Sequence, residues 1–197
     1  ECGSIANVTG YSCGRPCRRI GSHINTPTPT MTEAQRLLRQ IKAARLYTRE
    51  LLRSLPEEDW FRAPTEGVTH IAWQVGHLAF AQYSLALRRI RGEQPEDEQL
   101  IPADFLAAYG RGSVPDVERS RSLGLDAIRE VFDRVHQRVQ QELSDCTDEQ
   151  LSEPAIGPPH TMFKDKQGSL QWCVQHEFLH AGQIGLLRRL LGSQPLR

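Results

Sequence analysis

The spacing of apolar residues is the feature that most limits how this chain can fold. From Met31 onward these residues recur at steps of three and four, and no window alternates as a half-buried strand would. The pattern predicts four long amphipathic helices joined by long links rich in proline, glycine and charge, that is, an all-α four-helix bundle. These helices are expected at about residues 32–54, 68–92, 122–145 and 169–192, with a shorter helical piece at about 103–109.

Signals at the helix ends support this division. Ser169 is expected to cap the start of the last helix, which should stop at Gly192. The second helix closes in the basic turn of residues 88–91, followed by Gly92. A basic last turn and a glycine stop are typical of helix C-termini.

Residues 1–30 have a different character from the rest of the chain. They mix Gly, Ser, Thr, Pro and Arg without periodicity and end in alternating Thr and Pro at residues 26–30. Such a segment has no apolar face to bury. We therefore expect residues 1–30 to form a mobile N-terminal extension and residues 31–197 to form the bundle domain.

The balance of charged residues argues against a nucleic-acid partner. Acidic and basic side chains number 24 each, so the formal net charge is zero. Nucleic-acid-binding proteins usually have a basic excess, and no nucleic-acid partner is expected. No apolar run approaches the roughly 20 residues of a membrane-spanning helix, and no signal-peptide pattern is present. We expect a soluble cytoplasmic protein with a small-molecule substrate and no membrane partner.

Two histidines in the last predicted helix indicate a metal site. His176 and His180 are four residues apart, so their side chains lie one turn apart on one helix face and can bind one ion. Residues 176–180 also match the H-E-x-x-H signature of zinc proteases. Those enzymes take a third ligand from further along the chain, but residues 181–197 contain no Asp, Glu, His or Cys. The third ligand must therefore come from upstream, which argues against a protease.

The third ligand is not fixed by spacing alone. The second predicted helix carries a stripe of small and polar side chains on one face. The last predicted helix carries a similar stripe, and both are expected to point into the bundle. Facing polar groups must be satisfied once buried, and a shared metal ion would do so. The stripes comprise His70, Gln74, His77, Ala81 and Ser84, and Cys173, His176, His180 and Gln183. The competing histidines are His70, His77, His136 and His160.

Two separated motifs resemble the DinB-like family of metalloenzymes. They are Ile-Ala-Trp-Gln-Val-Gly-His-Leu-Ala at residues 71–79, and His-Glu-Phe-Leu-His-Ala-Gly-Gln-Ile at residues 176–184. The resemblance covers about residues 31–192 and implies a four-helix bundle, frequently a homodimer, that binds zinc, nickel or iron. It also implies that members with assigned activities use low-molecular-weight thiols such as bacillithiol and mycothiol. Carried over residue by residue, the metal ligands are His77, His176 and His180.

Three neutral imidazoles on a divalent ion leave positions open for substrate, as catalytic sites do. We expect a divalent-metal-dependent transferase that uses a low-molecular-weight thiol. A metal-dependent hydrolase and a non-catalytic metal-binding or interaction bundle are the alternatives. Glu177, about 100° round the helix from His176, is a candidate general base, an acceptor behind a ligand, or a solvent-facing charge. Cys173 is expected to pack rather than to bind metal.

Self-association is expected from the second predicted helix. It carries more large apolar side chains than one neighbouring helix would cover, and a two-fold pair is the commonest solution for such a surface. The resemblance also implies a homodimer. The side chains concerned are Trp73, Phe80, Tyr83 and Leu87.

Overall fold

The computed structural model describes residues 31–194 as a bundle of four long helical segments. The extension expected at residues 1–30 lies outside the described residues. Within the described part no strand forms, and the β contacts amount to one isolated bridge between Pro154 and Asp165. The predicted all-α four-helix bundle is confirmed. Its long segments are α1 (Glu33–Leu52), α2 (Ile71–Tyr83) continued by the π-helical stretch η2 (Ser84–Arg88) and α3 (Arg89–Arg91), α7 (Leu125–Ser144) and α9 (Lys166–Leu190).

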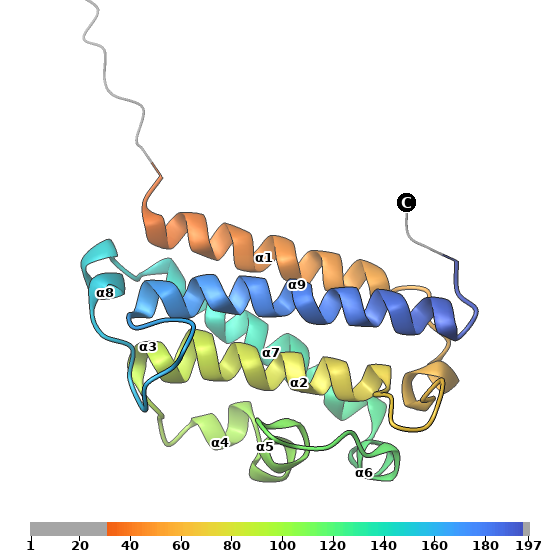
Figure 1. Ribbon diagram of the computed structural model, residues 1–197. Helices are drawn as coiled ribbons and strands as arrows, with labels where there is room; N and C mark the ends of the chain where they lie inside the picture. The colour runs from red at the N-terminus through yellow and green to blue at the C-terminus, as the bar shows by residue number, and fades with distance from the viewer. Residues whose placement is uncertain (1–30, 195–197) are drawn as a thin grey trace, which may run out of the picture. The chain divides into compact units, whose positions relative to one another are not determined.

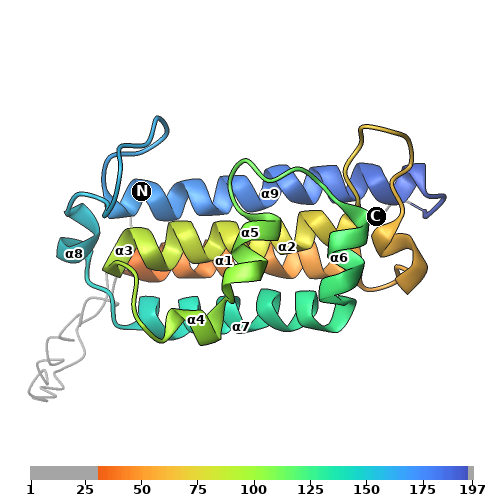
Figure 2. The ribbon, with the colours of Figure 1, turned by 90° about the horizontal axis from the view of Figure 1, so that it is seen from below.

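Shorter helices occupy the links between the long ones. Figure 2 shows α4, α5 and α6 lying across α2 and α7. The sequence predicts only α5 among the short elements, because helices as short as these give little periodic signal. The short elements are η1 (Glu57–Phe61), α4 (Asp97–Leu100), α5 (Ala103–Tyr109), α6 (Val117–Leu123) and α8 (Asp148–Ser152).

The prediction that Ser169 caps the last helix is wrong. Helix α9 begins one turn earlier, because the Asp165 carboxylate accepts a hydrogen bond from the Gly168 amide at 2.7 Å. Ser169 instead lies fully buried inside α9, where its hydroxyl donates to the Leu85 carbonyl of the π-helical stretch at 2.8 Å. This hydrogen bond joins the first turn of α9 to the π-helical stretch that continues α2.

The core fills the space between the long helices. It includes apolar side chains of the second helix that were expected to lie at a dimer interface. Tyr83 and Leu87 are 1% and 0% exposed, and Trp73 and Phe80 are half-buried against the core. The apolar surplus expected on the second helix is therefore not on the surface, and that reason for self-association is wrong. The homodimer itself stays a prediction. Large exposed apolar side chains on α1 and α9 are Leu46, Tyr47, Phe178, Leu179, Leu186 and Leu190.

The described helices also differ from membrane-spanning helices in their combination of length and apolarity. None of them is both long enough and apolar enough to cross a bilayer.

Candidate metal centre

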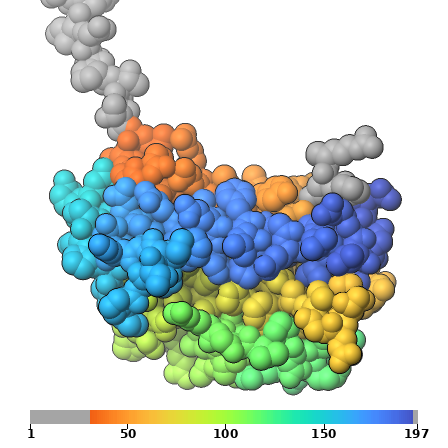
Figure 3. All heavy atoms as spheres, in the orientation of Figure 1, coloured from red at the N-terminus to blue at the C-terminus, as the bar shows by residue number. Residues whose placement is uncertain are grey.

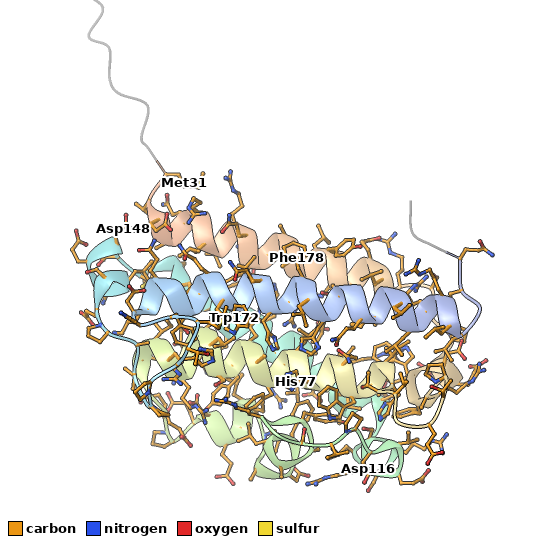
Figure 4. The ribbon with its side chains drawn as sticks, viewed as in Figure 1. Met31, His77, Asp116, Asp148, Trp172 and Phe178 are labelled. Carbon is orange, nitrogen blue, oxygen red and sulfur yellow. The ribbon has the colours of Figure 1, made fainter. Side chains whose placement is uncertain are left out.

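Three histidines from two facing helices converge at one point. His77 comes from α2, and His176 and His180 come from α9. Each offers a ring nitrogen, and these atoms all lie within 4.8 Å of one another. Figure 4 shows His77 between the α2 and α9 ribbons. Ligation of one ion at about 2.0–2.1 Å from each nitrogen would require the three nitrogens to lie about 3–4 Å apart.

A backbone carbonyl orients His77. Its Nδ1 donates a hydrogen bond to the carbonyl oxygen of Tyr109, the last residue of α5, at 2.8 Å. The ring also stacks on Trp73, with centroids 4.8 Å apart and planes 6° apart. A proton on Nδ1 leaves Nε2 free as the ligand atom, which is how histidine ligands are commonly held.

His180 is oriented by a side chain from the opposite helix. Its Nδ1 donates to Oε1 of Gln74 on α2, and both residues are buried. The predicted polar stripes of α2 and α9 therefore do satisfy each other, although Gln183 is exposed and does not take part. Nε2 of His180 remains available to an ion.

His176 supplies evidence that the site is built for a ligand. Its Nδ1 is buried and has no hydrogen-bond partner among the described residues. An unpartnered buried nitrogen of this kind costs about 1–3 kcal/mol. A set of three imidazoles, two of them pre-oriented and one with an unpartnered nitrogen, fits a divalent metal ion.

The protonation states of the three rings also suit a metal. Burial lowers the pKa of His77. Burial, with a smaller contribution from His77, lowers the pKa of His176 to about 4. Burial and the two neighbouring histidines lower the pKa of His180 to about 3. All three rings are therefore neutral near pH 7, which is the form that binds metal ions.

Gly76, next to His77 in the chain, allows Tyr109 to approach α2. A Cβ at position 76 would lie 2.5 Å from ring atoms of Tyr109, whose side chain is fully buried. Gly76→Ala must therefore push α5 away from His77. We expect it to cost about 1–3 kcal/mol of stability through overpacking and about 10–100-fold in affinity for added zinc through loss of the Tyr109 contact.

Thermal melting and calorimetric titration with zinc would measure both effects of Gly76→Ala. Gly182→Ala in α9 is the matched control, because a Cβ there meets nothing within 4 Å. It should melt at or slightly above the wild-type temperature, since alanine favours helix. Wild-type melting and zinc affinity in the Gly76 variant would show that α5 does not position His77.

Glu177 is directed at Arg45 of α1 and is not part of the three-histidine cluster. Both of its carboxylate oxygens accept hydrogen bonds from Arg45 of α1, at 2.7 and 3.1 Å. Arg45 also donates to the Phe132 carbonyl of α7 at 2.8 Å, and its guanidinium lies 3.6 Å from the centre of the Phe132 ring. Exposure of 3% for Glu177 shows that the interpretation as a solvent-facing charge is wrong. The pair joins α9 to α1 and α7.

The other candidate residues lie outside the three-histidine cluster. His70 caps α2 by accepting a hydrogen bond from the Trp73 amide at 3.2 Å. His136 of α7 pairs with Gln82 at 3.1 Å. Cys173 is buried in the core, and burial raises the pKa of its thiol to about 12, so it packs as an uncharged side chain.

His136 should make stability depend on pH. Burial first, and then Arg45, Arg49 and Lys42, lower its pKa from 6.5 to about 3. The unfolded chain therefore binds a proton between these values that the folded chain does not, so stability is complete above about pH 6.5 and falls as the pH decreases toward 3. Thermal midpoints between pH 7 and 4 should fall less steeply for His136→Asn than for the wild type. Parallel curves would contradict this.

A large pocket opens beside the histidines. It has a volume of about 800 Å³, and His77, His176, Trp172 and His160 contribute to its lining. The His160 ring stacks on Phe163 with centroids 4.2 Å apart. Figure 3 shows one face of the molecule, on which the light-blue segment before α9 and the green segment after α5 both lie below α9. Residues from both segments line the pocket.

Sequence reasoning missed this pocket and its arginines. Arg88, Arg89 and Arg111 all line it. The available signal was the pair of arginines at residues 88 and 89, but a basic turn there also has the simpler explanation of helix termination. The third arginine follows α5 in a link without periodicity, so nothing placed it near the others.

Comparison with known proteins adds a family match and a structural neighbour. The model of the DinB superfamily matches residues 40–184, a range that contains all three clustered histidines. No curated protein matches the chain. A solved structure of a conserved protein from Enterococcus faecalis is similar, with 17% identity and a TM-score of 0.62. The similarity covers 82% of this chain and 98% of that one, and at this identity it shows the fold alone.

Proposed function

The chain belongs to the DinB superfamily, and from this premise we propose that it is a metal-dependent transferase that uses a low-molecular-weight thiol. The observation that carries the proposal is the convergence of His77, His176 and His180 beside a pocket of about 800 Å³. These residues would hold a divalent ion, and zinc, nickel and iron all accept imidazole ligands. When bound, such an ion would lower the pKa of a thiol or a water that reaches it.

The placement of the ligands supports catalysis over a structural role. His77 and His176 line the pocket, whereas His180 lies behind them and is 7% exposed. The chain therefore supplies nitrogen ligands from one side and leaves the pocket side open to a substrate. Catalytic metal sites keep such an open position, and structural sites close it with a fourth protein ligand.

Glu177 supports thiol transfer over hydrolysis. A hydrolase of the H-E-x-x-H kind uses this glutamate as its general base. Here both carboxylate oxygens are engaged by Arg45, on the side of α9 away from the pocket. Among the described residues that line the pocket, Glu93 is the one carboxylate. A thiol reaction needs less from a protein base, because a lowered thiol pKa itself yields the nucleophile.

The experiment begins with metal analysis of protein purified without chelator and without nickel affinity resin. The loaded protein is then mixed with bacillithiol, mycothiol or glutathione and with 1-chloro-2,4-dinitrobenzene. We expect one metal ion per chain and metal-dependent formation of the thioether, in which a sulfur–carbon bond forms as chloride leaves and the thiol proton passes to solvent. Metal-dependent ester hydrolysis without thiol consumption would instead establish the hydrolase. Metal binding with neither activity would support the non-catalytic bundle.

A further inference from the structure

Three arginines that line the pocket have no carboxylate partner among residues 31–194. They are Arg88, Arg89 and Arg111, and none of them forms an ion pair there. Their neighbour Arg91 behaves differently, since it pairs with Asp97 at 2.7 Å and with Glu142 at 2.6 Å. Glu93 is the one carboxylate in the described lining, and it forms no ion pair with any of the three, so the pocket carries an excess of positive charge.

Arg89 builds the wall of the pocket. Its Nη1 donates to the carbonyl oxygens of Ile156 and Pro158, and the Ile156 amide donates to the Arg89 carbonyl at 2.9 Å. Gly157, at φ +94°, lies between these residues, and a Cβ there would come within 3.3 Å of the Arg89 guanidinium. The link before α9 is therefore fixed against α3.

The guanidinium groups of Arg88 and Arg111 have few hydrogen-bond partners among the described residues and are available to a ligand. The one side-chain hydrogen bond of Arg88 in the described structure goes to the Ser84 hydroxyl at 3.2 Å. Arg111 is exposed and has none. After burial, the largest causes that lower the pKa of Arg89 are the charges of Arg88 and Arg111, so the guanidinium groups are near enough to repel one another. An anion between them would relieve that repulsion.

Several large apolar side chains form another part of the lining. It includes Phe80, Leu85, Ile156, Met162 and Trp172. A ligand that matches both parts has an apolar body and an anionic group. Guanidinium groups bind carboxylates and phosphates through paired charge-assisted hydrogen bonds.

We propose that this pocket binds a small molecule with an oxyanion, a carboxylate or a phosphate, on an apolar body, and that Arg88 and Arg111 hold the oxyanion. The proposal rests on the proposed function only in placing the reactive end of this molecule at His77 and His176. The anion site itself needs no metal ion.

The test uses two fluorescent dyes on chelator-treated protein. 1-Anilinonaphthalene-8-sulfonate carries an anion, and N-phenyl-1-naphthylamine is the same body without it. We expect the sulfonate to bind the wild type more tightly than the neutral dye. Arg88→Gln and Arg111→Gln should each weaken sulfonate binding about tenfold or more, as loss of a hydrogen bond to a charged group does. Binding of the neutral dye should not change.

Arg39→Gln is the matched control, because Arg39 is exposed on α1 and lies outside the pocket lining. Its sulfonate affinity should equal that of the wild type, and circular dichroism should show all variants folded. Equal weakening of both dyes, or no weakening of either, would overturn the anion site. Displacement of the sulfonate by hexanoate or by hexyl phosphate identifies the preferred oxyanion, and equal displacement by hexanol would also overturn the proposal.

The dye experiment separates this inference from the proposed function. His180→Ala should keep the wild-type affinity for the sulfonate, because His180 is not part of the pocket lining. Loss of sulfonate affinity in the arginine variants, together with failure of thiol conjugation by the loaded wild type, would retain the anion site and reject the transferase. Conjugation by a protein whose arginine variants bind the sulfonate normally would do the reverse.

Discussion

Replacing His180 with alanine should remove the bound metal and lower thiol conjugation by more than about 100-fold, because loss of an outer hydrogen-bond partner alone costs about 10–100-fold. The bundle should stay folded. Its core is spread over four long segments, and an ion that binds only the native state adds stability only by mass action. Metal content, circular dichroism and conjugation rate of the same preparation would measure all three expectations.

Two further variants make this result specific. Gln74→Ala removes the acceptor that orients His180, so it should weaken metal binding by about 10–100-fold without abolishing it. His160→Ala removes a histidine of the pocket wall that is not in the cluster, and it should leave the metal content unchanged. Full metal occupancy in His180→Ala would refute the ligand assignment. Unfolding of both His180→Ala and His176→Ala on purification would assign the ion a structural role.

Glu177→Gln should show the opposite pattern, with a large loss of stability and little loss of activity. It leaves the Arg45 guanidinium buried without its counter-charge, which costs about 3–5 kcal/mol when a buried pair loses one partner. For a domain of this size that is a decrease of roughly 10 °C in thermal midpoint. Conjugation measured well below the melting temperature should change little, because the carboxylate faces α1 and α7.

The matched control for Glu177→Gln is Asp133→Asn. Its ion pair with Arg49 also joins two helices, but the side chains are 60% and 46% exposed, so less than about 1 kcal/mol should be lost. Arg45→Met combined with Glu177→Leu should recover part of the stability, since apolar pairs often replace buried ion pairs without cost. A loss of activity in Glu177→Gln as severe as in His180→Ala, with unchanged stability, would make Glu177 a general base and favour the hydrolase.

Periodicity and spacing predicted the parts of this molecule that depend on one helix at a time. The long helices and the shared face of His176 and His180 are of this kind. His77 needed the resemblance, because spacing alone could not rank it above His70. The partner of Glu177 is 132 positions away in the chain, so its burial depends on how α1 packs. The arginines of the pocket come together through links whose conformations follow from individual hydrogen bonds, not from any repeating pattern.

The π-helical stretch Ser84–Arg88 has a consequence for how this fold can diverge. A π turn holds one residue more than regular helix would need, and each residue turns an α-helix by about 100°. Deletion of a single residue there would restore regular helix and rotate Arg88 and Arg89 away from the pocket. His77 lies about two turns before Ser84 and would keep its position. A relative that differs by one residue in this stretch can therefore lose the arginines from its pocket, and with them the preference for an anionic ligand. The histidines of the pocket would be unchanged.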